Sequence, residues 1–234
     1  MAADLTGPVA VVAALNWESD VFSSCPLGEL PLLFETTGPG PAAAAAGAER
    51  AVARGAACLV SWGTAGALRQ GEPGNIVLPD RLLDDARRAF SIEMKLVEAL
   101  ARAFEPVGPI LRGTLASTSS PVTSVADKRT LANATDAIAV DMESVAIADV
   151  AARAGLPLVV VRVIVDRADR SVPAAAIAGM DGPRTRPGRV LAGLLVSPGD
   201  TGAVIALGRA ARRARQTLRA CAPILASIIK TQTD

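Results

Sequence analysis

The 234-residue chain contains no histidine and no tyrosine, and aromatic residues make up only 3% of it, although half of its residues are hydrophobic. The absence of histidine excludes Ser-His-Asp and Cys-His nucleophile systems, and it excludes metal sites that use imidazole. Acid–base chemistry must therefore come from carboxylates, lysine, cysteine or water. Because aromatics are so few, the core must be built from Ala, Val, Leu and Ile.

The net charge is close to zero and cysteines are few, and each of these features excludes further classes of protein. The formal net charge is only +1, so no basic excess points to a nucleic-acid partner. The start of the chain lacks a basic and apolar leader pattern. The longest apolar stretch, residues 156–165, contains Arg162 and is too short to span a bilayer. Three widely separated cysteines, at positions 25, 58 and 221, show no metal-ligand spacing. We therefore expect reduced thiols, no metal and a cytoplasmic protein.

Apolar segments of strand length alternate with helical segments along most of the chain. We expect strands at residues 8–15, 30–36, 57–62, 75–79, 110–117, 137–142 and 158–165. We expect helices at residues 40–54, at 91–104 with Ser91 as N-cap, and at 143–154 closed by Gly155. This alternation predicts an α/β domain around a mainly parallel sheet. Ligands of such sheets bind at the carboxyl ends of the strands.

The last quarter of the chain has a different composition. Residues 172–200 are rich in proline and glycine, and they predict a loop with one short helix at 190–196. Residues 201–229 predict a final helix with apolar positions at helical spacing and arginines largely on the opposite side. A packed surface helix with a solvated arginine face is the favoured interpretation, and contact with an anionic membrane surface is the alternative. No repeat or domain boundary is visible, so residues 1–234 are interpreted as one domain.

Two glycine-bearing stretches are candidates for ligand contact. "TGPGPAA" (residues 37–43) matches a dinucleotide fingerprint superficially, but no acid ends the next strand and two prolines remove backbone donors. A tight turn into an Ala-rich helix is the better interpretation. "SWGTAGAL" (residues 61–68) directly follows a buried strand. We interpret residues 63–66 as a turn, which is either purely structural or brings backbone amides and the Thr64 hydroxyl close to a ligand.

Carboxylates stand at the expected ends of three buried strands. In "VDMES", Asp141 is interpreted as a helix N-cap, whereas Glu143 is placed to accept two hydrogen bonds from a diol. In "VIVDRAD", Asp166 lies against an apolar wall, which predicts a raised pKa suited to a general acid. In "ALNWESD", Glu18 follows the first strand, where a lone exposed glutamate is the alternative. These three acids are the candidate carboxylates of a ligand site.

The order of these motifs resembles the purine nucleoside phosphorylase and nucleosidase superfamily. The matching stretches are "VVAALNWE", "TTGPG", "LVSWGTAGAL", "GNIVLPD" and "VDMESVAIADVAARAGLPLVVVRVIVDRAD", and they resemble the methylthioadenosine/S-adenosylhomocysteine nucleosidase branch in particular. The resemblance implies a single α/β domain around a twisted, barrel-like mixed β-sheet. "DRADRSVPAAAIAGMDG", "RVLAGLLVSPGD" and the arginine-bearing final helix look like the hopanoid-associated phosphorylase subfamily. That likeness implies removal of adenine from adenosylhopane, a triterpenoid lipid bearing adenosine.

The resemblance also assigns a role to each matching position. Glu18 matches the carboxylate that activates the attacking water, and Asp166 matches the acid that protonates purine N7. Glu143 matches the residue that binds the ribose hydroxyls, and Met142 the residue that packs by the sugar. The remaining positions are implied in substrate binding: Thr64, Ala65 and Gly66 beside the nucleophile, and Val122 at the base. No cofactor is implied, although phosphate is possible as a co-substrate.

Several departures from the family pattern bear on this assignment. Pro121 stands where relatives have an adenine-stacking aromatic, so base stacking is either weaker or comes from elsewhere, with Trp62 as the candidate. Ser61 and Trp62 precede the glycines where phosphorylases often have arginine, which favours water over phosphate as nucleophile. A salvage nucleosidase, a purine nucleoside phosphorylase and a non-catalytic nucleoside-binding protein are the alternatives. We also expect a homodimer and a small adenosine derivative as ligand, with a lipid-linked adenosine as one option, and peripheral contact of the C-terminal region with the inner membrane stays the alternative to a packed surface helix.

Overall fold

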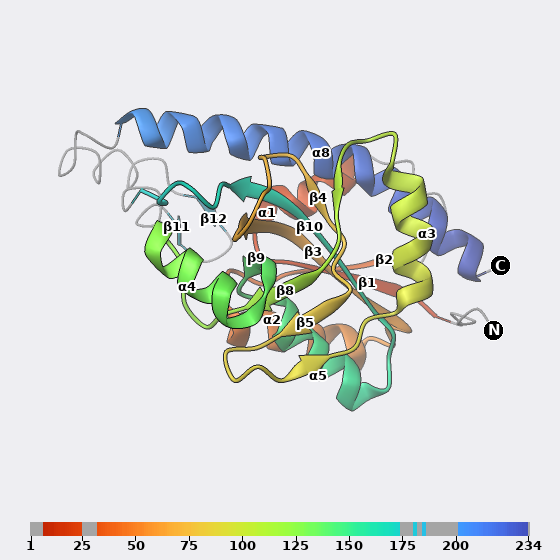
Figure 1. The fold of residues 1–234 in the computed structure, drawn as a ribbon. Coiled ribbons are helices and arrows are strands. Elements are labelled where there is room, and N and C mark those ends of the chain that lie inside the picture. Colours follow the sequence, from red (N-terminus) through yellow and green to blue (C-terminus); the bar gives the residue numbers. More distant parts are fainter. Residues whose placement is uncertain (1–6, 25–31, 174–179, 182–183, 186–200, 234) are drawn as a thin grey trace.

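The computed structural model describes residues 7–24, 32–173, 180–181, 184–185 and 201–233. Its centre is a mixed sheet in the order β6-β5-β8-β9-β3-β10-β4-β7, and β1 joins β3 and carries β2 (Figure 1). The strands of this sheet are β1 (Val9–Ala13), β2 (Leu32–Thr36), β3 (Cys58–Ala67), β4 (Ile76–Val77), β5 (Arg81–Leu83), β6 (Ala89–Phe90), β7 (Ile110–Leu111), β8 (Thr114–Ser117), β9 (Ala137–Asp141) and β10 (Leu158–Asp166). A separate pair is formed by β11 (Met180–Asp181) and β12 (Arg184–Thr185). The mixed sheet confirms the expected fold class.

Strand β3 is the branch point that curves this sheet. Its first half runs parallel to β1 and most of its length, from Leu59 to Gly66, runs parallel to β10, whereas Gly66 and Ala67 pair antiparallel with β9. One long strand thus joins two groups of strands that run in different directions. This branching gives the sheet the barrel-like twist that the resemblance implied.

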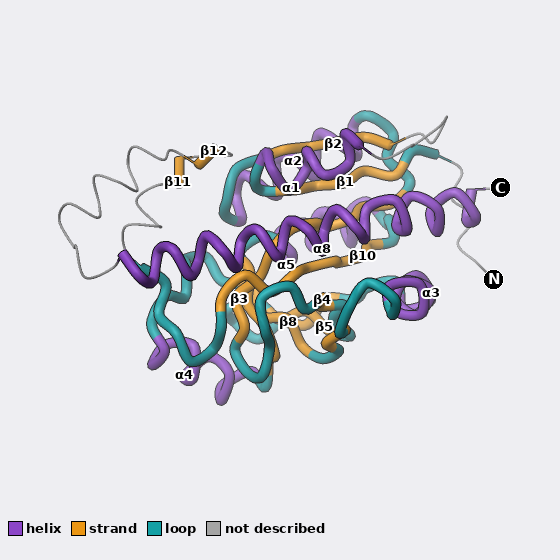
Figure 2. The backbone as a smooth tube through the Cα atoms, turned by 90° about the horizontal axis from the view of Figure 1, so that it is seen from above, coloured by secondary structure: helices purple, strands orange, loops and turns teal. Residues whose placement is uncertain are grey.

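Helices cover both faces of the sheet (Figures 1 and 2). They are α1 (Asn16–Ser19), the 3-10 turn η1 (Asp20–Ser24), α2 (Pro41–Ala53), α3 (Met94–Phe104), α4 (Val125–Thr135), α5 (Ser144–Ala154) and α8 (Thr201–Thr233). Helix α5 ends at Gly155, which adopts the left-handed conformation (φ 67°), as predicted. None of the described helices is long and apolar enough to cross a bilayer.

The central strands bury both of their faces, which explains why their sequences are apolar throughout. Successive side chains of a strand point to opposite faces. In β10, Val159, Val161 and Val163 join the core that packs against α3 and α8. Leu158 and Val160 instead join the core beneath α2 and α5. The sheet is therefore the middle layer of a three-layer α/β sandwich.

The sequence predicts a turn at residues 63–66, but these residues are part of strand β3. Each glycine gives space to a carboxylate from a neighbouring element. An ideal Cβ on Gly63 would lie 2.9 Å from Glu18 Cδ, and one on Gly66 would lie 2.9 Å from Asp166 Oδ1. The glycines therefore permit close approach of two acids to the strand, rather than a change of chain direction.

Other element boundaries also differ from the sequence prediction. Helix α3 is capped by Glu93 and not by Ser91, because residues 89–90 are held in β6. The expected strand 110–117 is divided into β7 and β8 at Gly113, whose φ is 144°. Strands β5 and β6 and helix α4 were not predicted from the sequence, and the final helix extends four residues beyond 229. The expected short helix at 190–196 lies outside the described residues.

Candidate active site

All eight side chains proposed for the site line one cavity of about 410 Å³. They are Glu18, Thr64, Ala65, Gly66, Val122, Met142, Glu143 and Asp166. They come from α1, β3, the segment before α4, the junction of β9 with α5, and the end of β10. Positions far apart in the sequence therefore meet at the carboxyl ends of central strands, which is the edge expected to bind a ligand.

Glu18 is held rigidly although its helix has only four residues. It is 2% exposed, and its Oε1 accepts hydrogen bonds from the backbone N and the Oγ1 of Thr64, both at 2.9 Å. Its Oε2 accepts from the backbone N of Leu15 at 3.0 Å. Burial raises the pKa of Glu18, and the nearby Arg162 charge opposes that rise. The exposed-glutamate alternative for this residue is wrong.

Arg162 is the main site residue that the sequence analysis missed. It lies in the middle of β10 and is 2% exposed. Its Nε donates to Asp141 Oδ2 at 2.7 Å, and its Nη2 donates to the hydroxyls of Ser61 (2.7 Å) and Ser144 (3.0 Å). A charge inside an apolar run needs such partners, and "VVVRVIVD" contains this signal. Although Ser61 and Trp62 precede the glycines in the sequence, Arg162 of β10 lies beside them, because an ideal Cβ on Gly63 would lie 2.9 Å from Arg162 Nη1.

Asp141 is an ion-pair partner rather than the N-cap of α5. The N-cap position belongs to Glu143, whose side chain does not cap the helix. Asp141 is 6% exposed, and besides Arg162 it accepts a hydrogen bond from Ser117 Oγ at 2.7 Å. Its contact with the backbone N of Ser144, at 3.3 Å, is longer. The prediction failed because a buried guanidinium from a distant strand is a stronger partner than a helix amide.

Glu143 faces the cavity from the start of α5. Its Oε1 accepts a hydrogen bond from the backbone N of Gly40 at 2.9 Å, and its Oε2 lies 3.8 Å from Arg162 Nη2. Burial and the charge of Asp141 raise the pKa of Glu143 to about 7. The Gly40 contact also explains "TGPGPAA", since the amide between the two prolines holds a carboxylate. Pro41 then begins α2, as expected for a turn into an Ala-rich helix.

Asp166 ends β10 and forms an ion pair with Lys128 of α4, whose side chain is fully buried. The Lys128 ammonium also donates to the backbone oxygens of Arg167 (2.7 Å) and Arg170 (2.9 Å). Burial raises the pKa of Asp166 and the Lys128 charge opposes it, with a net rise. The upward direction agrees with the prediction, but the lysine was missed because α4 has little apolar periodicity to mark a buried face.

Trp62, the candidate for base stacking, cannot stack on a ligand in this cavity. Its side chain is fully buried in the core beneath α8, where it packs on Phe22 with ring centroids 5.0 Å apart. Its Nε1 donates to the backbone oxygen of Glu18 at 3.0 Å, so it supports the short helix that carries this acid. Trp17, one residue before Glu18, lines the cavity instead.

One side of the cavity is apolar and is formed in part by α8. Val165 and Val172 lie opposite residues Val204, Leu207, Gly208 and Ala211 of that helix. A smaller cavity of about 260 Å³ continues from it and shares Val165, Asp166, Val172 and Leu207. The polar groups described above are thus joined to a mainly apolar extension between β10 and α8, whose lining also includes Glu72, Arg167, Arg170 and Arg213.

A larger hollow of about 640 Å³ adjoins the smaller cavity at Glu72 and Arg167, and its lining contains none of the eight residues. Its charged lining is largely neutralised, because Arg69 pairs with Asp136 and Arg167 pairs with both Glu72 and Asp169. Among the described residues, no group of three or more acidic or cysteine side chains is placed to hold a metal ion. The 410 Å³ cavity is therefore the candidate active site.

Comparison with known structures supports this fold. A 5′-methylthioadenosine/S-adenosylhomocysteine nucleosidase from Neisseria meningitidis, solved with methylthio-immucillin-A, matches 96% of this chain and 99% of its own, at 20% identity and a TM-score of 0.69. Futalosine hydrolase of Helicobacter pylori matches 98% of both chains at 16% identity and a TM-score of 0.68. A Helicobacter pylori nucleosidase of the first type matches 98% of both chains at 16% identity and a TM-score of 0.67.

Sequence comparison identifies the family. No curated protein sequence is similar enough to count as a relative. The model of the phosphorylase superfamily matches residues 18–181, which is well over half of the chain and contains every proposed site residue. The chain belongs to the phosphorylase superfamily.

Proposed function

We propose that this protein cleaves the N-glycosidic bond of a 5′-substituted adenosine and releases adenine. The observation that carries the proposal is the meeting of Glu18, Glu143 and Asp166 in one cavity at the strand ends. Cleavage of this bond passes through an oxocarbenium-like state. It requires an acid at the leaving base, a nucleophile at the sugar, and groups that hold the sugar hydroxyls. Three carboxylates can meet all three needs in a chain without histidine.

Asp166 is the proposed general acid. Its raised pKa lets it carry a proton nearer neutral pH than an ordinary aspartate does. The proton moves to purine N7 while the C1′–N9 bond breaks, and the bonding electron pair passes into the base. Adenine then leaves as a neutral molecule.

Glu18 is the proposed general base for water. Thr64 and the Leu15 amide hold its carboxylate in one position. A water oxygen attacks C1′ as one of its protons moves to Glu18, which yields a free sugar. Glu143 accepts hydrogen bonds from the ribose hydroxyls, and Met142 packs beside the sugar.

Water is favoured over phosphate by the local charges. Three buried carboxylates, Glu18, Asp141 and Glu143, surround the single guanidinium of Arg162, which already donates to Asp141 and to two serine hydroxyls. A phosphate dianion placed here would meet more negative than positive charge. We therefore infer hydrolysis rather than phosphorolysis.

The apolar extension beneath α8 supports an apolar 5′ substituent. Burial of hydrocarbon against Val165, Val172 and Leu207 would contribute roughly 25 cal/mol for each Å² removed from water. Adenosylhopane is the substrate we propose on these grounds, which implies a role in hopanoid biosynthesis. Methylthioadenosine is the second candidate, because a Helicobacter pylori structure of the same fold holds that molecule in its active site.

The proposed setting of the enzyme is the cytoplasm, as a homodimer with peripheral contact to the inner membrane. Sedimentation equilibrium of the full chain tests the dimer. A monomer at all concentrations would exclude it.

The test of function is adenine release from adenosylhopane and from methylthioadenosine, each with and without phosphate, with identification of the sugar product. We expect adenine and free sugar from adenosylhopane, and loss of turnover in Asp166→Asn. Asp169→Asn is the matched control, because that acid lies three residues away in the other hollow. Faster release from methylthioadenosine would indicate a salvage nucleosidase. Binding of either substrate without any adenine release would indicate a non-catalytic nucleoside-binding protein.

A further inference from the structure

Helix α8 has one face that packs on the protein and an opposite face that does not. Ala214, Leu218, Cys221 and Leu225 follow helical spacing and are at most 1% exposed. They belong to the core that also contains β10 and α3. At 100° per residue, the opposite stripe runs through Ile205, Arg209, Arg212 and Arg219. All four of these residues are exposed.

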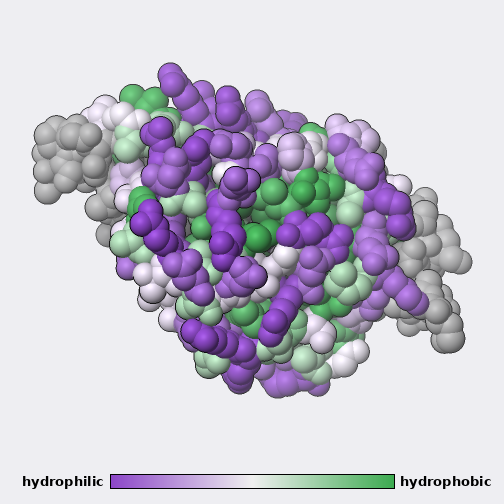
Figure 3. All heavy atoms as spheres, in the orientation of Figure 1, coloured by the Kyte–Doolittle hydropathy of each residue, from purple (hydrophilic) through white to green (hydrophobic). Residues whose placement is uncertain are grey.

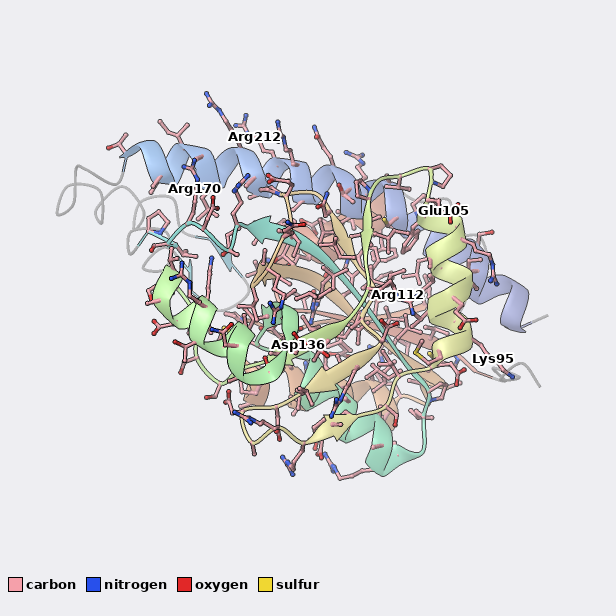
Figure 4. All side chains as sticks on the ribbon, in the orientation of Figure 1. Lys95, Glu105, Arg112, Asp136, Arg170 and Arg212 are labelled. Atoms are coloured by element: carbon pink, nitrogen blue, oxygen red, sulfur yellow. The ribbon has the colours of Figure 1, made fainter. Side chains whose placement is uncertain are left out.

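The outward face of α8 is cationic. Arg209, Arg212 and Arg219 are exposed on this stripe, the exposed Arg213 and Arg215 lie beside it, and no acid occurs between residues 201 and 233. Within the described part of the chain, none of the five forms an ion pair. Eight arginines elsewhere, such as Arg50 and Arg153, do form ion pairs. Figure 4 shows Arg212 directed away from the body, and Figure 3 shows hydrophilic side chains along this edge.

We propose that the outward face of α8 binds the surface of an anionic lipid bilayer. Guanidinium groups form strong hydrogen bonds to phosphate, and five of them on one helix complement a surface of anionic headgroups. Ile205 precedes Arg209 by one turn on the same stripe and is 51% exposed. A bilayer interface accepts such an apolar side chain beside the arginines.

The same helical segment connects this surface with the cavity. Val204, Leu207 and Ala211 on its inward side line the active-site cavity, while Ile205, Arg209 and Arg212 lie on its outward side. A helix is only about 10–12 Å across, so docking would bring the apolar end of the cavity close to the lipid. Delivery of a substrate from the bilayer to the cavity is a separate inference that rests on the proposed function, since the substrate would be an adenosine with an apolar tail. Binding to the bilayer itself does not depend on that step.

The test uses the full chain and sedimentation with vesicles of phosphatidylcholine, with and without phosphatidylglycerol. We expect binding only to the anionic vesicles and a strong decrease with salt. The test variant combines Arg209→Gln, Arg212→Gln and Arg219→Gln and so removes three cations. Each arginine is expected to contribute about fivefold to the affinity for anionic vesicles, so this affinity should fall by roughly two orders of magnitude. The matched control combines Arg81→Gln, Arg102→Gln and Arg129→Gln, which removes the same charge from exposed positions elsewhere. It should bind almost like the wild type.

Two outcomes overturn the proposal. One is equal loss of binding in both triple variants, which would reduce the effect to net charge. The other is tighter binding to duplex DNA than to anionic vesicles, with no effect of Ile205→Ser on vesicle binding. Adenine release from methylthioadenosine in solution separates this proposal from the proposed function. The α8 triple variant should keep the wild-type rate whether or not the wild type binds vesicles.

Discussion

The buried ion pair between Lys128 and Asp166 makes the sharpest prediction, because it links stability with catalysis. Lys128→Met keeps the length of the side chain and removes its charge. The variant loses a partner for Asp166 and the donors to two backbone oxygens, at 2.7 and 2.9 Å. Breaking a buried pair by removing one partner costs about 3–5 kcal/mol, which is a large part of the stability of a typical domain.

The cost should depend on pH, because Asp166 can take up a proton once Lys128 is gone. Burial already raises the pKa of Asp166 against the opposing lysine charge, so the substitution raises that pKa further. A carboxyl whose pKa is higher in the folded state binds more protons there than in the unfolded chain. The free energy of unfolding therefore falls as pH rises from the ordinary value of 3.8 to the raised pKa, by about 1.4 kcal/mol per pH unit. Urea denaturation at a series of pH values measures this slope.

Catalysis should change in a way that a purely structural role would not produce. If protonated Asp166 is the acid, kcat/KM declines as pH rises through its pKa, and Lys128→Met moves this alkaline limb to higher pH. Lys95→Met is the control, since Lys95 is exposed on α3 (Figure 4). A uniform loss of kcat/KM at every pH, with the limb unmoved, would refute the reasoning. Lys128 would then only hold the residues after β10 in place.

Four further predictions concern other parts of the site. Glu18→Gln should lower kcat about 10²–10⁴-fold while an uncleavable C-nucleoside analogue still binds, and near wild-type turnover would exclude its role as base. Because Glu143 has a pKa of about 7, the affinity for that analogue should rise as pH increases through 7, and a 2′,3′-dideoxy analogue should show no such rise by calorimetry. Arg162→Met should cost about 3–5 kcal/mol in urea denaturation by leaving Asp141 unpaired, and a change under 1 kcal/mol would contradict the buried pair. Gly66→Ala should displace Asp166, since the added Cβ would lie 2.9 Å from its Oδ1, and it should reduce kcat about 10²-fold and lower the melting temperature because it disturbs the buried pair with Lys128.

Much of the fold could be predicted from local sequence pattern. Buried strands such as β10 are long apolar runs, and α5 has both a periodic face and the terminal Gly155, so their positions were recognisable. The edge of the sheet where Glu18, Glu143 and Asp166 meet followed from their places after strands. Short strands of two or three residues, such as β5 and β6, carry too little pattern to be seen.

The partners of the site residues could not be predicted, because they depend on contacts between distant segments. Arg162 reaches Asp141 across 21 residues of sequence, and Lys128 reaches Asp166 across 38. The glycines of β3 were interpreted as a turn because glycine usually marks one, whereas here they give space to carboxylates from other elements. A lysine in a polar helix and a tryptophan after a strand carry no local sign of whether they are buried.

Adenine release from adenosylhopane in oxygen-18 water, with mass spectrometry of the sugar, tests the central claim most directly. We predict adenine release with one labelled oxygen at C1′ of the sugar, at the same rate with and without phosphate, and no release by Asp166→Asn. A sugar 1-phosphate that forms only when phosphate is present would contradict water as the nucleophile. Unchanged adenine release by Asp166→Asn would contradict the assignment of the acid.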